Sequence, residues 1–264
     1  MSYETIIYEK EGGIATLTFN RPQVMNAMDY QMAIVEMPAA IEEARNDDEV
    51  RVLIVTGAGR GFCAGDDVKA RFLAKDRDKH RAEEKIAELK GIRQPSYFVG
   101  FYKPTIAAVN GPAVGGGLDL ALSCDIRLAS ENAKFGYLFV QRSLMGRAEP
   151  LMMLIHIVGL SRALEMMYSG ELMGAAEAEK VGLVSRVVTQ DRLMDEAREL
   201  AHKLMKGAPL AQQAIKQAVY KALFNPSGLT EFASLVRMLL GETEDHREGA
   251  RAFAEKRDPV YKGK

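Results

Sequence analysis

Two glycine-rich segments carry residues whose types and spacing suit chemistry on a negatively charged oxygen. The first, residues 61–67 (GFCAGDD), follows an apolar run at 50–56, and the second, residues 110–119 (NGPAVGGGLD), follows a similar run at 105–110. Continuous apolar runs of this length predict buried strands. Because α/β proteins bind ligands beyond the carboxyl ends of such strands, both segments are candidate ligand-binding turns.

The glycines of these turns indicate what kind of group they would offer a ligand. Glycine has no Cβ, so a backbone N–H can approach a ligand closely. The triple glycine at 115–117 also opens an apolar segment, 118–124, which we expect to form a helix with an N-terminus that favours an anion. The turns therefore predict backbone donors for an anion, although two tight turns that merely pack together would use the same residues.

Other catalytic and cofactor-binding patterns fail on their spacing. Residues 57–61 (GAGRG) follow a strand, but the third glycine of a dinucleotide-binding turn would fall on Phe62. No phosphate-binding loop, serine-hydrolase elbow or zinc spacing is present, so we predict no metal and no permanently bound cofactor. Cys63 has no histidine near it in sequence, which favours packing over a nucleophilic role. The histidines are scattered, at 80, 156, 202 and 246.

The elements around the two turns favour an α/β core followed by helices. A β-prone run at 14–19 and an apolar run at 125–129 predict two more strands, and apolar residues at helical spacing predict a helix at 29–45. Strands that alternate with helices favour a largely parallel, covered sheet. We divide the chain into a core, 1–195, and a helical region, 196–264. Helices are predicted at 191–205, 210–223, 229–240 and 244–256.

Composition excludes several classes of partner. The chain has 264 residues, 47% hydrophobic and 27% charged, with a net charge of −1. This charge gives no basic field for nucleic acid, and no apolar run approaches the roughly 20 residues that cross a membrane. Two cysteines and the lack of a signal-peptide pattern predict a cytoplasmic protein, although a processed organellar protein would look the same. Residues 75–90 are dense in both charges and predict a surface helix or a flap beside the pocket.

Several motifs in order resemble the crotonase superfamily, also called the enoyl-CoA hydratase/isomerase family. The resemblance runs nearly end to end. It implies an α/β fold built as a spiral of β-β-α units, with a C-terminal helical trimerisation region, assembled as a homotrimer or a dimer of trimers. The motifs are NRP at 20–22, NAM at 26–28, FCAGDD at 62–67, KPTIAAVNG at 103–111, GGGLDLAL at 115–122, CD at 124–125 and FAEKR at 253–257.

The resemblance also assigns site residues. It implies an oxyanion hole made by the N–H groups of Ala64 and Gly116, and an acyl-CoA thioester substrate, with coenzyme A bound only as part of that substrate. An acyl thioester that loses an α-proton or gains a nucleophile at Cβ develops charge on its carbonyl oxygen, which two such donors stabilise. The implied contacts to coenzyme A are Val24, Met25, Ala64 and Asp66, with Phe253 and Lys256 of a neighbouring subunit.

The acid and base residues depart from the pattern of the family's hydratases. Asp119 occupies the position of their first glutamate, and Phe139 that of the second, so one acid is lost. Glu149 lies close to the lost acid in sequence and could replace it, or it could be a helix-start glutamate favoured by the helix dipole. Asp119 could likewise be a buried structural carboxylate. Arg147 could orient Glu149 or bind an acidic acyl group.

The predicted function is hydration of an α,β-unsaturated acyl-CoA. A working pair of carboxylates favours hydration, whereas a single base favours isomerisation of an enoyl- or dienoyl-CoA. Decarboxylation and thioester hydrolysis within the family are further alternatives. Because the second glutamate is lost at Phe139, a noncatalytic acyl-CoA-binding protein is also an alternative. If Phe139, Met145 and the apolar residues at 151–153 line the acyl pocket rather than the core, the acyl group is greasy, cyclic or aromatic. Apolar residues of the last helices suggest a subunit interface.

Overall fold

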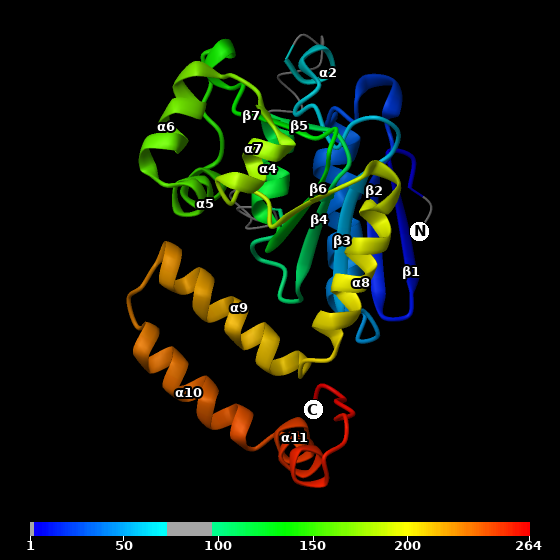
Figure 1. The fold of residues 1–264 in the computed structure, drawn as a ribbon, viewed down its shortest axis with the longest axis vertical. Helices are drawn as coiled ribbons and strands as arrows, with labels where there is room; N and C mark the ends of the chain where they lie inside the picture. The colour runs from blue at the N-terminus through cyan, green and yellow to red at the C-terminus, as the bar shows by residue number, and fades with distance from the viewer. Residues whose placement is uncertain (1–2, 73–96) are drawn as a thin grey trace.

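A six-stranded sheet forms the body of the molecule (Figure 1). The computed structural model describes residues 3–72 and 97–264, so the charged segment predicted at 75–90 lies outside the described residues. The strand order is β1-β2-β3-β4-β6-β9, with β1 antiparallel to β2 and every other pair parallel. The strands are β1 (Ile6–Glu11), β2 (Ile14–Phe19), β3 (Val52–Gly57), β4 (Thr105–Val109), β6 (Ile126–Ser130) and β9 (Arg186–Val188).

Burial on both faces explains why the inner strands were predictable from apolar runs. The strands predicted at 14–19, 50–56, 105–110 and 125–129 correspond to β2, β3, β4 and β6, which confirms them. On β3, Leu53 and Val55 face one apolar cluster, and Val52 and Ile54 face the other. The second cluster is closed by α8 (Leu193–Met205), which packs against β3, β4 and β6.

A small second sheet stands beside the ends of the large one. It contains β5 (Pro112–Val114), β7 (Lys134–Gly136) and β8 (Met173–Gly174), in the order β5-β7-β8. A parallel bridge between Cys63 and Ala113 ties the first glycine-rich turn to β5. This sheet is too short to give an apolar run, and sequence periodicity did not predict it.

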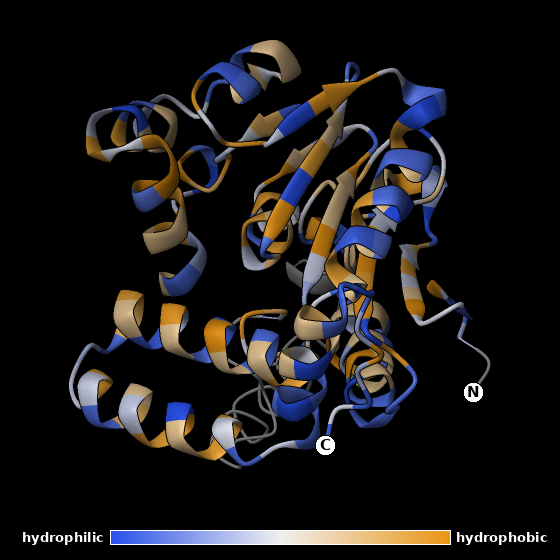
Figure 2. Cartoon of the chain, turned by 60° about the horizontal axis from the view of Figure 1, so that its bottom comes forward, coloured by the Kyte–Doolittle hydropathy of each residue, from blue (hydrophilic) through white to orange (hydrophobic). Residues whose placement is uncertain are grey.

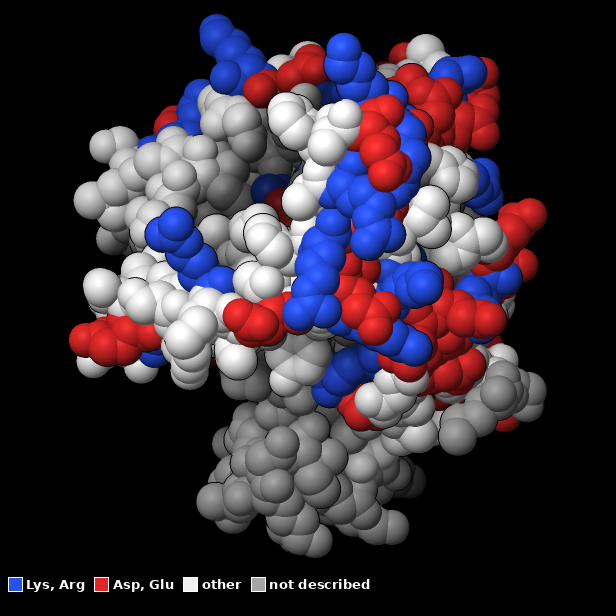
Figure 3. Space-filling view, turned by 90° about the horizontal axis from the view of Figure 1, so that it is seen from below, with Lys and Arg blue, Asp and Glu red and all other residues white. Residues whose placement is uncertain are grey.

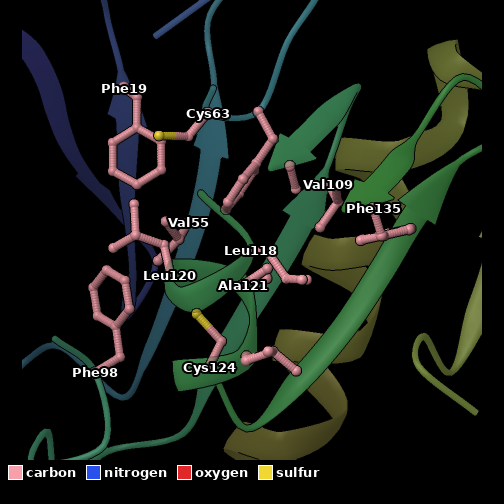
Figure 4. Packing of buried hydrophobic residues seen from close by; sticks show 14 of the residues in the cluster. Phe19, Val55, Cys63, Phe98, Val109, Leu118, Leu120, Ala121, Cys124 and Phe135 are labelled. Atoms are coloured by element: carbon pink, nitrogen blue, oxygen red, sulfur yellow. The ribbon is translucent and has the colours of Figure 1, made fainter. Parts of the chain in front are cut away.

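Helix α4 (Gly116–Ser123) begins inside the triple glycine and confirms the predicted helix at 118–124. All of its residues are buried. Figure 4 shows Leu118, Leu120 and Ala121 of this helix among apolar side chains of the strands. Because the helix is enclosed, the backbone at its N-terminus is held firmly relative to the sheet.

The remaining helices of the core cover the sheets. The predicted helix at 29–45 consists of a π-helical segment, Gln31–Glu36, which continues into α1 (Met37–Asn46). Short 3-10 segments occur at Pro22–Val24, Val140–Arg142 and Gln190–Arg192. Further core helices among the described residues are α2 (Val68–Phe72), α5 (Ala148–Val158), α6 (Leu160–Ser169) and α7 (Ala175–Lys180).

Three C-terminal helices leave the core, α9 (Pro209–Phe224), α10 (Leu229–Gly241) and α11 (Glu244–Glu255). They confirm the helices predicted at 210–223, 229–240 and 244–256. The predicted boundary between 195 and 196 needs correction, because it falls within α8, which covers the sheet. We therefore place the boundary between α8 and α9, and α9 is joined to the core by bonds from Lys216 and Tyr220 to Asp125 (Figure 1).

The projecting helices keep much apolar surface uncovered. No residue of α10 is buried, and α9 and α10 carry apolar bands along their length (Figure 2). Large exposed apolar side chains on them are Ile215, Val219, Leu235, Met238 and Leu239. Seen from below, charges of both signs are interleaved on the surface rather than separated into one field (Figure 3). Within 3–72 and 97–264, no helix combines the length and the apolar character needed to cross a membrane.

Candidate active site

The two glycine-rich turns meet at the carboxyl ends of β3 and β4. Gly65 has a φ of 86°, and a Cβ on it would lie 3.0 Å from the backbone nitrogen of Gly116. A Cβ on Gly117 would lie 1.9 Å from the carbonyl oxygen of Cys63, closer than any side chain permits. Glycine is therefore required here because two backbone segments are in contact.

A cavity of about 220 Å³ opens where the turns meet. Its lining includes residues 64–66 and 114–116 of the two turns, together with Val68, Leu138, Phe139, Arg142 and Leu144. Sequence reasoning missed Leu138, Arg142 and Leu144, because the 3-10 turn at Val140–Arg142, in or beside which they lie, gives no periodic signal.

The predicted pair of oxyanion donors needs one correction. The N–H of Ala64 donates to the carbonyl oxygen of Met25 at 2.9 Å, so this group serves the turn rather than a ligand. Gly116 keeps its predicted place, because it opens α4 and the first N–H groups of a helix have no acceptor within the helix. Ala64 remains a residue of the cavity wall.

Asp66 lies next to Gly116 in this arrangement. Its neighbours bridge to Met28, since the N–H of Met28 donates to Gly65 at 2.7 Å and the N–H of Asp67 donates to Met28 at 2.8 Å. In a parallel bridge this pattern directs the N–H of Asp66 away from Met28. The positive φ of Gly65 turns the chain between Ala64 and Asp66, which the sequence alone did not reveal.

Asp119 is a buried carboxylate behind the cavity. It is 2% exposed, and its Oδ2 accepts the backbone N–H of Arg147 at 3.2 Å. Its Oδ1 has no hydrogen-bond partner within the described part of the chain. Burial raises the pKa of Asp119 to about 7, the charges of Asp66 and Glu149 add to that rise, and Arg147 opposes it. Such a pKa suits a group that both takes and gives a proton near neutral pH.

Phe139 and Tyr137 surround Asp119. Phe139 lines the cavity, so an aromatic ring stands where the family's hydratases carry their second glutamate. Its ring contacts that of Tyr137 edge-on, with centroids 4.9 Å apart. The hydroxyl of Tyr137 accepts the N–H of Gly146 at 2.7 Å. Tyr137 was not predicted as a site residue, because the strand before it, β7, is too short to give a periodic pattern.

Glu149 and Arg147 begin α5. Glu149 is half-buried, and it is not among the described residues that line the cavity. Its charge nevertheless contributes to the raised pKa of Asp119. The guanidinium of Arg147 lies over the ring of Tyr97, 4.6 Å from its centroid. Arg147 and Glu149 therefore lie near Asp119, but neither is among the described residues that line the cavity.

The predicted contacts to coenzyme A fall into two groups. Val24 and Met25 adjoin the cavity turn, where Arg60 donates to the sulfur of Met25 at 3.1 Å. Phe253 lies on α11 and Lys256 caps it, at the opposite end of the chain from this turn (Figure 1). A single chain therefore does not bring the second group to the cavity. Phe253 is 88% exposed, as a residue available to another subunit would be.

The cysteines take no part in the site. Burial raises the pKa of the Cys63 and Cys124 thiols to about 12, so both are neutral at physiological pH. Figure 4 shows both side chains among hydrophobic residues. This confirms the packing role predicted for Cys63. Among the residues that the structure describes, no cluster of histidine, cysteine and carboxylate side chains could hold a metal ion.

Backbone donors at a helix start, beside a buried carboxylate with a raised pKa, define an enzyme that works on a carbonyl compound. Comparison with known proteins makes this specific. Residues 9–264 match the family model described as enoyl-CoA hydratase/isomerase. The chain belongs to that family and is one of its enzymes.

Relatives and solved structures cover nearly the whole chain. It is 36% identical to the (E)-benzylidenesuccinyl-CoA hydratase of Thauera aromatica, over 98% of this chain and 99% of the relative. It is also 36% identical to the 2,3-dehydroadipyl-CoA hydratase of Escherichia coli K12, over 98% and 99%. An enoyl-CoA hydratase structure from Geobacillus kaustophilus superposes with a TM-score of 0.87 at 38% identity, over 99% of both chains. The predicted crotonase-like fold is confirmed.

Proposed function

We propose that this enzyme is an enoyl-CoA hydratase that adds water to the double bond of an α,β-unsaturated acyl-CoA, with Asp119 as its working carboxylate. The observation that carries this proposal is the burial of Asp119 beside the cavity with a pKa near 7. Phe139 removes the usual second acid, and Glu149 stands outside the lining of the cavity that the structure describes. One carboxylate therefore handles both proton transfers.

The reaction balances with a single carboxylate. The oxygen of water bonds to Cβ of the acyl group while one of its protons passes to ionised Asp119. The electrons of the double bond move toward the thioester carbonyl and leave an enolate. Asp119 then returns the proton to Cα, and the product is a β-hydroxyacyl-CoA.

The enolate oxygen needs two donors, and we place them on Gly116 and Asp66. The N–H of Gly116 opens α4, so the helix dipole adds to its hydrogen bond. The bridge to Met28 leaves the N–H of Asp66 facing away from Met28, and Asp66 lines the same cavity as Gly116, which supports this choice. Donors fixed in the backbone need no reorganisation during the reaction, and for that reason they stabilise the enolate more effectively.

The acyl group is expected to be apolar with an acidic end. The cavity lining includes Phe139, Leu138 and Leu144, and Arg142 is the one positive side chain among the described cavity residues. The names of two relatives, the benzylidenesuccinyl-CoA and dehydroadipyl-CoA hydratases, specify acyl groups that retain a second carboxylate. Arg142 is placed to pair with such a carboxylate.

A panel of acyl-CoA thioesters tests this function. Purified enzyme is given crotonyl-CoA, cinnamoyl-CoA and 2,3-dehydroadipyl-CoA, and hydration is followed by loss of the conjugated thioester absorbance. We expect hydration, with the acidic substrate favoured. Double-bond migration without hydration would replace the hydratase with an isomerase. No turnover of any member would favour a noncatalytic acyl-CoA-binding protein.

Substitution of Arg142 tests the acidic preference. Charged hydrogen bonds contribute roughly 1.5–3 kcal/mol, so Arg142→Gln should lower kcat/KM for 2,3-dehydroadipyl-CoA about 10-fold or more. Crotonyl-CoA, which has no second carboxylate, should be hydrated within about 3-fold of the original rate. Arg198→Gln, on the exposed side of α8, is the matched control. Equal losses on both substrates would show that Arg142 contacts the coenzyme A portion instead.

The projecting helices support a homotrimer, or a dimer of such trimers. Apolar surface of this extent on α9 and α10 is unfavourable in water and suits burial against another subunit. A neighbouring α11 would then supply Phe253 and Lys256 to coenzyme A. Light scattering at micromolar protein should give a trimer or hexamer, and a stable monomer would contradict this assembly. Two free, buried cysteines fit a cytoplasmic location.

A further inference from the structure

Arg21 holds three separate segments of the chain with one guanidinium. Its Nη2 donates to Oδ2 of Asp67 at 3.2 Å and lies 3.3 Å from Oδ2 of Asp29. Its Nη1 donates to the carbonyl oxygen of Ala27. The side chains of Arg21, Asp29 and Asp67 are only 15% to 22% exposed. Because water reaches these groups little, their attraction is screened less than that of surface ion pairs.

The two carboxylates are themselves fixed to the backbone. Oδ1 of Asp29 accepts the N–H of Met32, in the π-helical segment, at 2.9 Å. Oδ1 of Asp67 accepts the N–H of Ala70, in α2, at 3.1 Å. Each carboxylate therefore uses one oxygen for the start of a helix and the other for Arg21. A planar guanidinium serves several acceptors in fixed directions at once, which an ammonium group cannot do.

Met28 connects this network to the two donors placed at the enolate oxygen. Its N–H donates to Gly65 and its carbonyl oxygen accepts the N–H of Asp67, so its backbone holds the residues on both sides of Asp66. Its side chain is fully buried, and its terminal methyl carbon lies 2.8 Å from the point that a Cβ on Gly116 would occupy. Met28 therefore contacts Gly116 with its side chain and holds Asp66 with its backbone.

Arg21 binds the chain on both sides of the bridge between Met28 and Asp66. Ala27, whose carbonyl oxygen it binds, precedes Met28, and Asp67 follows Asp66. Without the guanidinium, the carboxylates of Asp29 and Asp67 would repel each other with no cation of Arg21 between them, and the bridge would shift. Arg21 is not among the described residues that line the cavity, so it acts on the reaction only through these contacts.

We propose that Arg21 is a positioning residue that sets the distance between the two oxyanion donors, the N–H groups of Gly116 and Asp66, by holding Met28 against the first glycine-rich turn. This proposal rests on the function proposed above, which places the enolate oxygen between these donors. Arg21 makes no bond to the substrate and moves no proton. A displacement of about 1 Å in a catalytic group can cost about 10²-fold in rate, so a contact outside the cavity can control kcat.

Infrared spectroscopy of a bound thioester measures the donors directly. Butyryl-CoA labelled with ¹³C at its carbonyl is saturated, so it binds without being hydrated, and donors that polarise the carbonyl lower its stretching frequency. We expect the original enzyme to lower this frequency relative to butyryl-CoA in water, and Arg21→Met to lose about half of that shift or more. For crotonyl-CoA, Arg21→Met should lower kcat about 10- to 100-fold, with KM within about 3-fold of the original value. Arg186→Met, which removes a surface ion pair with Glu196, is the matched control and should change neither measurement.

Two milder variants test the role if Arg21→Met does not fold. Arg21→Lys keeps the positive charge but not the fork of donors, and Asp67→Asn keeps a helix cap but removes the charge that faces Arg21. Each should lower kcat about 3- to 10-fold and reduce the shift of the carbonyl frequency. The variant with both changes should be no slower than the slower of the two, because both remove the same contact.

Each other outcome overturns a distinct statement. A fall in kcat with an unchanged carbonyl frequency would show that Arg21 does not act through the donors. A rise in KM alone would assign Arg21 to the binding of coenzyme A and exclude the positioning role. Unchanged kcat and frequency in Arg21→Met, or in both milder variants, would remove Arg21 from the mechanism and leave the hydratase function intact. An original enzyme that shifts the carbonyl frequency but hydrates nothing would overturn the hydratase function and leave the role of Arg21 standing. No shift in the original enzyme would overturn the placement of the donors and this role with it.

Discussion

Replacing Asp119 by asparagine should stabilise the protein while it removes activity. The carboxylate is 2% exposed, and burial raises its pKa from an ordinary 3.8 to about 7. The folded state therefore binds this proton more tightly than the unfolded state does. The stability that comes with protonated Asp119 is fully present below about pH 4 and is lost as the pH rises through about 7. The charged groups around it, Arg147, Asp66 and Glu149, are unchanged in the variant.

The size of the effect follows from the two pKa values. Each unit of difference corresponds to about 1.4 kcal/mol, so the raised pKa lowers the free energy of unfolding by roughly 1.7 kcal/mol at about pH 5, where only the unfolded state has ionised Asp119, and by roughly 4 kcal/mol at about pH 8.5, where both states have. Asparagine has the same shape and no charge to bury. The free energy of unfolding of Asp119→Asn relative to the original protein should therefore increase by about 2.5 kcal/mol between these two conditions.

Denaturant unfolding at both pH values measures this difference. Protein concentration must be the same in every sample, because the stability of an oligomer depends on it. Glu171→Gln, at an exposed carboxylate, is the control and should show a difference that does not vary with pH. A constant offset for Asp119→Asn across the pH range would refute the raised pKa. Hydration by the same variant should fall about 10²-fold or more, the scale of losing a positioned acid or base.

Four further results are expected. Gly116→Pro should lower turnover about 10²–10³-fold, because proline is tolerated at the first position of a helix but removes the N–H donor. A variant that is folded by circular dichroism and still active would exclude Gly116 from the oxyanion hole. Gly117→Ala should lower the melting temperature or prevent folding, since its methyl would lie 1.9 Å from the Cys63 carbonyl oxygen, and an unchanged melting curve would contradict that contact. Glu149→Gln should change hydration less than about 3-fold if Asp119 works alone, whereas a 10²-fold loss would establish a carboxylate pair. The rate of hydration should rise with pH through about 7 as Asp119 ionises, and Asp119→Asn should lose that dependence.

Predictions from the sequence succeeded where one physical signal dominated. The inner strands β3 and β4 are buried on both faces, so their apolar runs identified them. The triple glycine predicted the helix start that Gly116 now occupies, and the resemblance to the family singled out Gly116 and Asp119 there.

The predictions from the sequence failed where the direction of the backbone, or a contact between distant segments, decides the structure. The sequence places Ala64 and Asp66 in one turn, but it does not reveal the positive φ of Gly65 or the hydrogen bond that the Ala64 N–H makes to Met25. The short strand Lys134–Gly136 has no room for a periodic pattern, so the position of Tyr137 beside Asp119 could not be foreseen. The core extends past residue 195 because α8 packs against the sheet. No local signal in the sequence marks these contacts.

The exposed state of α10 has a consequence for the motions of the protein. A helix with no buried residue is protected from opening only by the helices on either side of it and by any subunit that covers it. Its amide hydrogens should therefore exchange with solvent much faster in dilute protein than in concentrated protein. Amides of β3 and β4, which lie inside the sheet, should exchange far more slowly than those of α10 at either concentration. The same dilution should weaken the affinity for coenzyme A if a neighbouring α11 holds its nucleotide.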